Sequence, residues 1–81
     1  MTQINDGIAK IVQIYMKNVT FDESMYERDL IALGMNSIAF IQIITAIEEK
    51  FDVEIPDEYL LSRQLNSISK MGNVVYQLIG E

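Results

Sequence analysis

The sequence contains no cysteine and no histidine. Without histidine, the chain lacks the side chain that most often transfers protons near neutral pH, and without cysteine it lacks the usual soft nucleophile. Zinc and redox centres lose their ordinary ligands, and no disulfide can stabilise so short a chain. These absences argue against an enzyme or a metal site, and they indicate that the fold depends on packing alone.

Basic residues are scarce: six lysines and arginines stand against twelve acidic residues, which gives a formal net charge of -6. This balance argues against binding nucleic acid or an anionic membrane surface, because both need a basic patch. It favours protein partners with Arg- and Lys-rich docking patches. No apolar run approaches the roughly 20 residues that span a bilayer, and residues 1–6 lack the basic start of a signal peptide. We therefore expect a soluble, cytoplasmic and monomeric protein.

What the sequence does contain is helical periodicity. Its length and its apolar content of 49% indicate one globular domain, residues 1–81. Apolar residues at three- and four-residue steps predict helices over about residues 3–17, 37–51 and 68–79, with a short helix over about 57–62. Asn36 and Ser67 are good N-caps for two of them. The expected fold class is all-α, a small bundle of three longer helices and one short helix.

The connections carry weaker signals. Asn18 is suited to end the first helix in a left-handed conformation. The run Ser24-Met25-Tyr26-Glu27 has the form of a capping box and predicts one or two helical turns near residues 24–31. Gly34 frees the backbone to turn into the next helix. Residues 52–56 alternate like a strand but have no partner strand, so we expect an extended loop that buries Val53 and Ile55. The apolar residues expected to pin the long connection to the core are Phe21, Met25, Leu30, Ile31 and Leu33.

Ser37 opens the longest apolar-periodic segment. Its hydroxyl should lie at the positive end of a helix, where a phosphate is stabilised by about 1 kcal/mol. No histidine, nearby lysine or G-x-S-x-G elbow is present to activate it as a nucleophile. From position alone an ordinary first-turn serine is the simpler interpretation, and an attachment point for a phosphoryl-linked group is the alternative.

The helix predicted over 37–51 carries more apolar residues than one core face needs. Stepping about 100° per residue gathers the core face into one arc. Its members are Phe40, Ile43, Ile44, Ile47 and Phe51. Ile38 and Ile41 fall on the other side, so they either pack under the long connection or form a small docking patch for a partner. The candidate docking residues are Met35, Ile38, Ile41, Gln42, Thr45, Glu48 and Glu49.

Four further acids lie close together in sequence, at Asp52, Glu54, Asp57 and Glu58. They could bind a divalent cation weakly, but no EF-hand spacing is present. A solvated acidic face is the better interpretation.

Three stretches together resemble the acyl carrier protein family, whose fold the peptidyl and aminoacyl carrier domains share. They are Leu33-Gly34-Met35-Asn36-Ser37-Ile38, Ile47-Glu48-Glu49-Lys50-Phe51 and Val53-Glu54-Ile55-Pro56-Asp57-Glu58. The resemblance covers nearly the whole chain. It implies that Ser37, within the motif of Gly34 and Asn36, carries a 4′-phosphopantetheine transferred from coenzyme A by a phosphopantetheinyl transferase. The thiol of that arm would hold an acyl or aminoacyl group as a thioester, and the chain would present it to other enzymes rather than catalyse a reaction.

The sequence departs from the fatty-acid pattern at two positions. Asn36 stands where fatty-acid carriers usually have aspartate, and Gln42 stands where the family often has an acid. We therefore expect a carrier of a specialised pathway, such as polyketide or nonribosomal peptide synthesis. The length of the chain suggests a discrete protein, and a domain excised from a larger synthase is the alternative. Its partners would be a loading enzyme and downstream synthases or transferases. The alternatives are a housekeeping fatty-acid carrier and a helical interaction module that is never modified.

Overall fold

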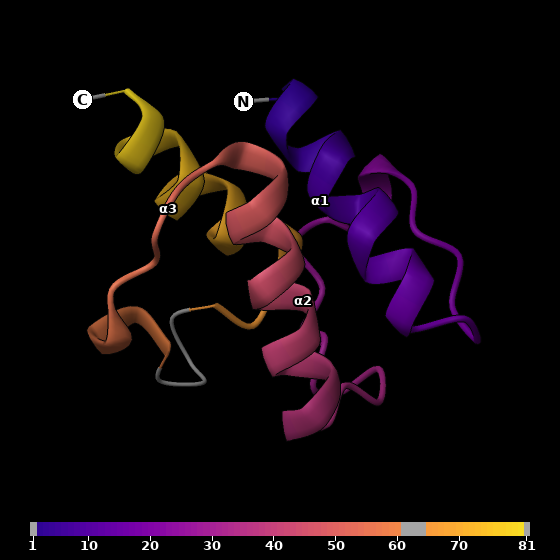
Figure 1. Cartoon of the computed structure of the whole chain (residues 1–81). Coiled ribbons are helices and arrows are strands. Elements are labelled where there is room, and N and C mark those ends of the chain that lie inside the picture. The colour runs from indigo at the N-terminus through magenta and orange to yellow at the C-terminus, as the bar shows by residue number, and fades with distance from the viewer. Residues whose placement is uncertain (1, 61–64, 81) are drawn as a thin grey trace.

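A computed structural model describes residues 2–60 and 65–80 of the chain (Figure 1). The elements are α1 (Thr2–Tyr15), η1 (Glu23–Met25), α2 (Ser37–Phe51), η2 (Asp57–Leu60) and α3 (Ile68–Ile79), where η marks a 3₁₀ helix. No strand occurs among the described residues. The predicted all-α bundle is confirmed. The short helix predicted over 57–62 is a 3₁₀ turn as far as Leu60, and its last two positions lie outside the described residues.

The helix α1 packs against both α2 and α3. The start of α1 and the end of α3 lie at one end of the bundle, whereas α2 begins at the opposite end (Figure 1). The side chains that are fully buried between the elements are Ile8, Val12, Leu30, Ile43, Ile47, Leu65, Ile68, Met71 and Val75. Burial of each contributes about 1.5–3 kcal/mol relative to exposure, which is how a chain without disulfides holds together.

The end of α1 differs from the prediction. The helix stops at Tyr15 rather than near residue 17, and Asn18 does not adopt a left-handed conformation. The reason is the side chain of Gln13, whose amide donates to the carbonyl oxygens of Met16 and Val19 and whose oxygen accepts from the Phe21 N–H. The Gln13 side chain therefore supplies hydrogen-bond partners for the backbone groups that follow the helix, and a left-handed cap is not required.

The connection between α1 and α2 is also organised differently. Asp22, not Ser24, is the N-cap of the 3₁₀ helix η1 in this stretch. The predicted capping box is wrong because the Asp22 carboxylate accepts from both the backbone N–H and the hydroxyl of Ser24. The connection is fixed to α1 through the Tyr26 hydroxyl, which donates to Asp6, and it is fixed next to α3 through the Leu30 N–H, which donates to the Asn66 carbonyl at 2.8 Å.

Both ends of α2 are closed by side-chain and backbone groups. Oδ1 of Asn36 accepts from the Ala39 N–H at 2.8 Å, which confirms the predicted cap. At the other end Asp52 adopts a left-handed conformation with φ of 54°. The Val53 N–H then donates to the Glu48 carbonyl at 3.1 Å. In the loop that follows, Ile55 is buried and Val53 is half-buried, close to the prediction.

The last helix begins as predicted. The buried Ser67 hydroxyl accepts from the Lys70 N–H at 3.1 Å and caps α3. No helix among the described residues is long and apolar enough to cross a bilayer.

Candidate functional site

Ser37 is the first residue of α2, and its side chain is exposed. Asn36 precedes it in an extended conformation, with φ of -100° and ψ of 177°. The first turn of α2 contains no acidic residue, so its unpaired N–H groups leave a positive partial charge beside the Ser37 hydroxyl. No described residue forms a hydrogen bond with that hydroxyl, and the chain contains no histidine that could activate it.

A tight turn before α2 brings Ser37 to the surface. The Gly34 N–H donates to the Ile31 carbonyl at 3.1 Å, and the Met35 N–H donates to the Leu30 carbonyl at 2.9 Å. Gly34 has a φ of 112°, a conformation that residues with a Cβ rarely adopt. The predicted role of Gly34 as a turning point is confirmed by this angle. A Cβ there would meet no atom within 4 Å, so only backbone strain requires the glycine.

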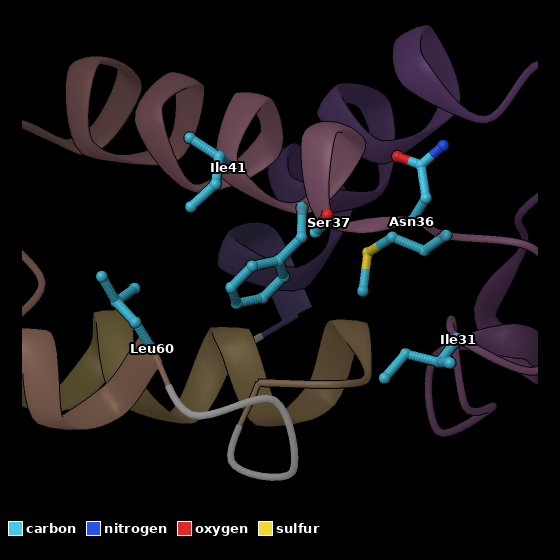
Figure 2. Close-up of a pocket in the computed structure, with 7 residues that line it drawn as sticks. Ile31, Asn36, Ser37, Ile41 and Leu60 are labelled. Carbon is cyan, nitrogen blue, oxygen red and sulfur yellow. The ribbon is translucent and has the colours of Figure 1, made fainter.

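A hollow of about 430 Å³ opens beside Ser37, and we call it the Ser37 hollow (Figure 2). Its lining residues are Ile31, Met35, Asn36, Ser37, Phe40, Ile41 and Leu60. Figure 2 shows Ile41 from α2 and Leu60 from η2 on one side of Ser37, with Ile31 of the long connection on the other. None of the lining residues is charged. The hollow therefore suits an uncharged, largely apolar group next to the hydroxyl.

The structure corrects the placement of two residues from the sequence analysis. Met35, proposed as a docking residue, is only 6% exposed, because the turn at Gly34 directs it into the wall of the Ser37 hollow. Ile31, expected in the core, is 47% exposed and lines the same hollow. Leu60 also lines the hollow, and no sequence pattern predicted that role because Leu60 belongs to a different segment from Ser37.

The outer face of α2 decides between the two interpretations of its extra isoleucines. Ile38 is 71% exposed and Ile41 is 53% exposed, so neither packs under the long connection. Gln42, Thr45 and Glu49 are exposed on the same helix. No residue of α2 from Ser37 to Ile47 is charged, so the surface next to Ser37 is apolar and neutral. We use the name docking face for Ile38, Ile41, Gln42, Thr45, Glu48 and Glu49.

Glu48 differs from the other members of the docking face. It is half-buried, and its Oε2 accepts a hydrogen bond from the Ile55 N–H at 2.8 Å. The neighbouring Glu49 is exposed. Sequence reasoning assigned both acids to docking and did not find that one of them also holds the following loop.

The acids beyond α2 lie at the surface. Asp52, Glu54, Asp57 and Glu58 are all exposed. Within the described ranges, no group of three or more acidic side chains is placed to hold a metal ion.

Comparison with known proteins bears directly on this site. A family model described as "Phosphopantetheine attachment site" matches residues 9–75, which include Ser37 and most of the bundle. The chain is 40% identical over 73 residues to the acyl carrier protein of Clostridium acetobutylicum, covering 90% of this chain and 83% of that protein. It is 33% identical over 71 residues to the acyl carrier protein of a Sulfurovum species, covering 86% and 87%.

A relative with a different printed name is also similar. The chain is 41% identical over 49 residues to the aminoacyl carrier protein of Agrobacterium fabrum, and this match covers 60% of the chain and 59% of that protein. No solved structure matches the chain significantly.

Proposed function

The chain belongs to the acyl carrier protein family, a family of carriers with a covalently attached 4′-phosphopantetheine, and on that premise we propose that Ser37 is the residue that bears this group. The observation that carries the proposal is the exposed Ser37 hydroxyl at the start of α2, beside an uncharged hollow and inside the matched region. A carrier needs an accessible hydroxyl that is inert by itself and a neighbouring surface that accommodates the arm or its cargo.

The residues around Ser37 fit a phosphodiester on its Oγ. The unpaired N–H groups of the first turn would stabilise the phosphate by about 1 kcal/mol. Asn36 keeps that turn closed through its hydrogen bond to Ala39, and Gly34 provides the backbone turn that exposes the serine. The partner transferase would have to remove the hydroxyl proton, because no described residue next to Ser37 can do so.

The attached group supplies a thiol that holds the cargo as a thioester, which the chain cannot provide because it has no cysteine. The apolar lining of the Ser37 hollow would exclude water from an apolar cargo placed against it. The protein would then act by presentation, with all bond-making supplied by its partner enzymes.

We further propose that partners bind the docking face. Ile38 and Ile41 supply an apolar centre within reach of Ser37, and Gln42, Thr45 and Glu49 supply a polar rim. The partners would be the phosphopantetheinyl transferase, a loading enzyme and the downstream synthase or transferase enzymes.

The pathway we propose is a specialised one, because Asn36 and Gln42 leave the surface near Ser37 without the usual acids. A relative named as an aminoacyl carrier supports it. The alternative, a housekeeping fatty-acid carrier, is favoured by the acyl carrier relatives, whose matches cover more of the chain. Neighbouring genes distinguish the two: an adenylation enzyme would indicate an amino or aryl acid, and ketosynthases a fatty acid or polyketide.

The experiment that tests attachment is a mass measurement. The unmodified chain is incubated with coenzyme A and a broad-specificity phosphopantetheinyl transferase, and its intact mass is taken. We expect wild type and Ser24→Ala, which removes another exposed serine, to gain one phosphopantetheine each, and Ser37→Ala to gain none. Absence of any gain on wild type, under conditions that load a control carrier, would contradict the carrier proposal and favour the unmodified interaction module.

A further inference from the structure

Two asparagines in the chain are followed by serine: Asn36 precedes Ser37, and Asn66 precedes Ser67. An asparagine before a small residue can lose its side-chain amide, because the backbone nitrogen of the next residue attacks the side-chain carbon, Cγ. A β-branched neighbour hinders that attack, as at Asn18, which valine follows. The structure places the two asparagine–serine pairs in different surroundings and so distinguishes between them.

The backbone nitrogen of Ser37 is open to this reaction. Asn36 lies outside α2, Ser37 is the first residue of α2, and both are exposed. The Ser37 N–H is one of the first-turn donors that a helix leaves unpaired, and no described residue accepts from it. The rotation that brings this nitrogen to Cγ of Asn36 breaks one helical hydrogen bond, from the Phe40 N–H to the Asn36 carbonyl at 2.9 Å. The attacking group is therefore accessible at the cost of one hydrogen bond.

The side-chain amide of Asn36 is held where the fold favours the same reaction. Its Oδ1 accepts from the Ala39 N–H at 2.8 Å, at the positive end of α2. Negative charge develops on that oxygen when a nitrogen attacks Cγ, and donors aimed at such an oxygen stabilise the transition state. The first turn of α2 has no acid to oppose this effect. The stabilisation available at a helix N-terminus corresponds to a rate about two- to fivefold higher.

The other asparagine–serine pair lacks these features. Asn66 is half-buried and Ser67 is buried. The Asn66 carbonyl accepts from the Leu30 N–H at 2.8 Å, so a rotation there would separate two segments that are far apart in the sequence. At the start of α3 the Lys70 N–H donates to the Ser67 hydroxyl, whereas in α2 the equivalent donor acts on the asparagine itself. Asn66 is therefore an internal control with the same two residue types.

We propose that Asn36 is a modification site, at which the folded chain deamidates without an enzyme. The Ser37 nitrogen forms a bond to Cγ of Asn36, the Cγ–Nδ2 bond breaks, and the amide leaves as ammonia with the proton that the Ser37 nitrogen gives up. Water then opens the cyclic imide. Addition of water at Cγ gives aspartate at position 36, and addition at the backbone carbonyl carbon gives isoaspartate. Both products place a negative charge beside Ser37.

The two products differ in their effect on Ser37, and this part rests on the proposed attachment there. Aspartate keeps the N-cap and puts its charge at the positive end of α2. Isoaspartate routes the backbone through the former side chain, which lengthens the path to Ser37 by one carbon and removes the cap geometry. We expect isoaspartate chains to be loaded at least about tenfold more slowly, because a displacement of about 1 Å can lower a rate by about a hundredfold.

The first test compares the two asparagine–serine pairs in one molecule. The unmodified chain is incubated in mildly alkaline buffer, and peptide mapping by mass spectrometry follows the replacement of amide by acid at each asparagine. In the native chain we expect Asn36 to react about fivefold or more faster than Asn66, and no more slowly than it does in urea. In urea, where both pairs are exposed, the two rates should become similar. Asn36→Gln, whose longer side chain closes a larger ring slowly, should gain no acid at position 36.

The second test follows the consequence for Ser37. Aged wild type and freshly prepared Asn36→Asp are incubated with coenzyme A and a broad-specificity phosphopantetheinyl transferase. Peptides that contain aspartate or isoaspartate at position 36 are then separated by chromatography and weighed. We expect phosphopantetheine on the aspartate peptides of both proteins and little on the isoaspartate peptide of aged wild type.

Equal rates at Asn36 and Asn66 in the native chain would overturn the modification site. A native rate at Asn36 below its rate in urea would overturn it as well, because the fold would then protect this residue. Equal loading of isoaspartate and aspartate chains would overturn the effect on Ser37. Failure of fresh wild type to gain phosphopantetheine would overturn the attachment together with that effect. The modification site would then still stand or fall by the first test, which uses no transferase.

Discussion

Asn36 closes the first turn of α2 directly before the proposed attachment serine, so its replacement tests how that turn is held. Its Oδ1 accepts from the Ala39 N–H at 2.8 Å. Asn36→Ala removes the acceptor and should lower the free energy of unfolding by about 1 kcal/mol, the usual loss for an N-cap. In a domain of this size that corresponds to a decrease in Tm of about 4–8 °C.

Asn36→Asp should act in the opposite direction. A carboxylate keeps the cap and adds a negative charge at the positive end of α2, where the first turn has no acid. The expected gain is about 0.3–1 kcal/mol. The net charge of -6 disfavours a further negative charge, so the expected gain lies toward the lower end of that range.

Urea unfolding followed by circular dichroism measures both effects, with Asn18→Ala as the control because Asn18 is exposed and does not cap a helix. The gain of Asn36→Asp should shrink as salt is raised, since the Debye length is about 10 Å at 0.1 M. The loss of Asn36→Ala comes from a hydrogen bond and should persist. The reasoning is refuted if Asn36→Ala is as stable as wild type, or if Asn36→Asp is destabilised to the same extent as Asn36→Ala.

Two further predictions concern the docking face and the anchor of the long connection. Ile41→Asn should lower kcat/KM for the phosphopantetheinyl transferase by about tenfold, because the apolar centre of the docking face is lost. The control is Ile14→Asn, at an exposed isoleucine on α1, which should leave kcat/KM unchanged. Equal effects of the two substitutions would contradict the docking face. The hydrogen bond to Asp6 raises the pKa of Tyr26 from 10.0 to about 12. The contribution of this hydrogen bond to the free energy of unfolding should therefore be complete below pH 10 and lost as the pH rises toward 12. Urea midpoints across this range should fall less in Tyr26→Phe than in wild type, and parallel decreases would exclude a role for this pair.

The sequence predicted the elements whose signals are local. The bounds of α2 and α3 agree with the prediction because each has a capping side chain next to a long apolar period, at Asn36 and Ser67. The proposal that Ser37 is the attachment site also rests on a local signal. A glycine turn, a cap and a serine lie within four residues, at positions 34, 36 and 37, and their geometry depends little on the rest of the chain.

The predictions that failed involve competition between neighbouring polar groups. At the end of α1, Asn18 was a reasonable terminator by residue type, but the Gln13 side chain reaches forward and satisfies the same backbone groups. In the long connection, Ser24 had the pattern of a cap, but the Asp22 carboxylate is the stronger acceptor and binds the Ser24 N–H itself. Propensity ranks each residue alone, whereas each backbone N–H or C=O group pairs with whichever neighbouring polar side chain can reach it.

The Ser37 hollow could not be predicted because three separate segments form it. Ile31 comes from the long connection, Ile41 from α2 and Leu60 from η2, and no period within one segment shows that they meet. The loop before Leu60 also contains a contact over seven residues, because the Ile55 N–H donates to the Glu48 carboxylate. The proposed attachment uses one exposed hydroxyl at the start of a helix, and a short stretch of sequence was enough to predict that position. The shape of the surface that meets the cargo depends on tertiary contacts, so carriers with the same motif can differ in what they hold.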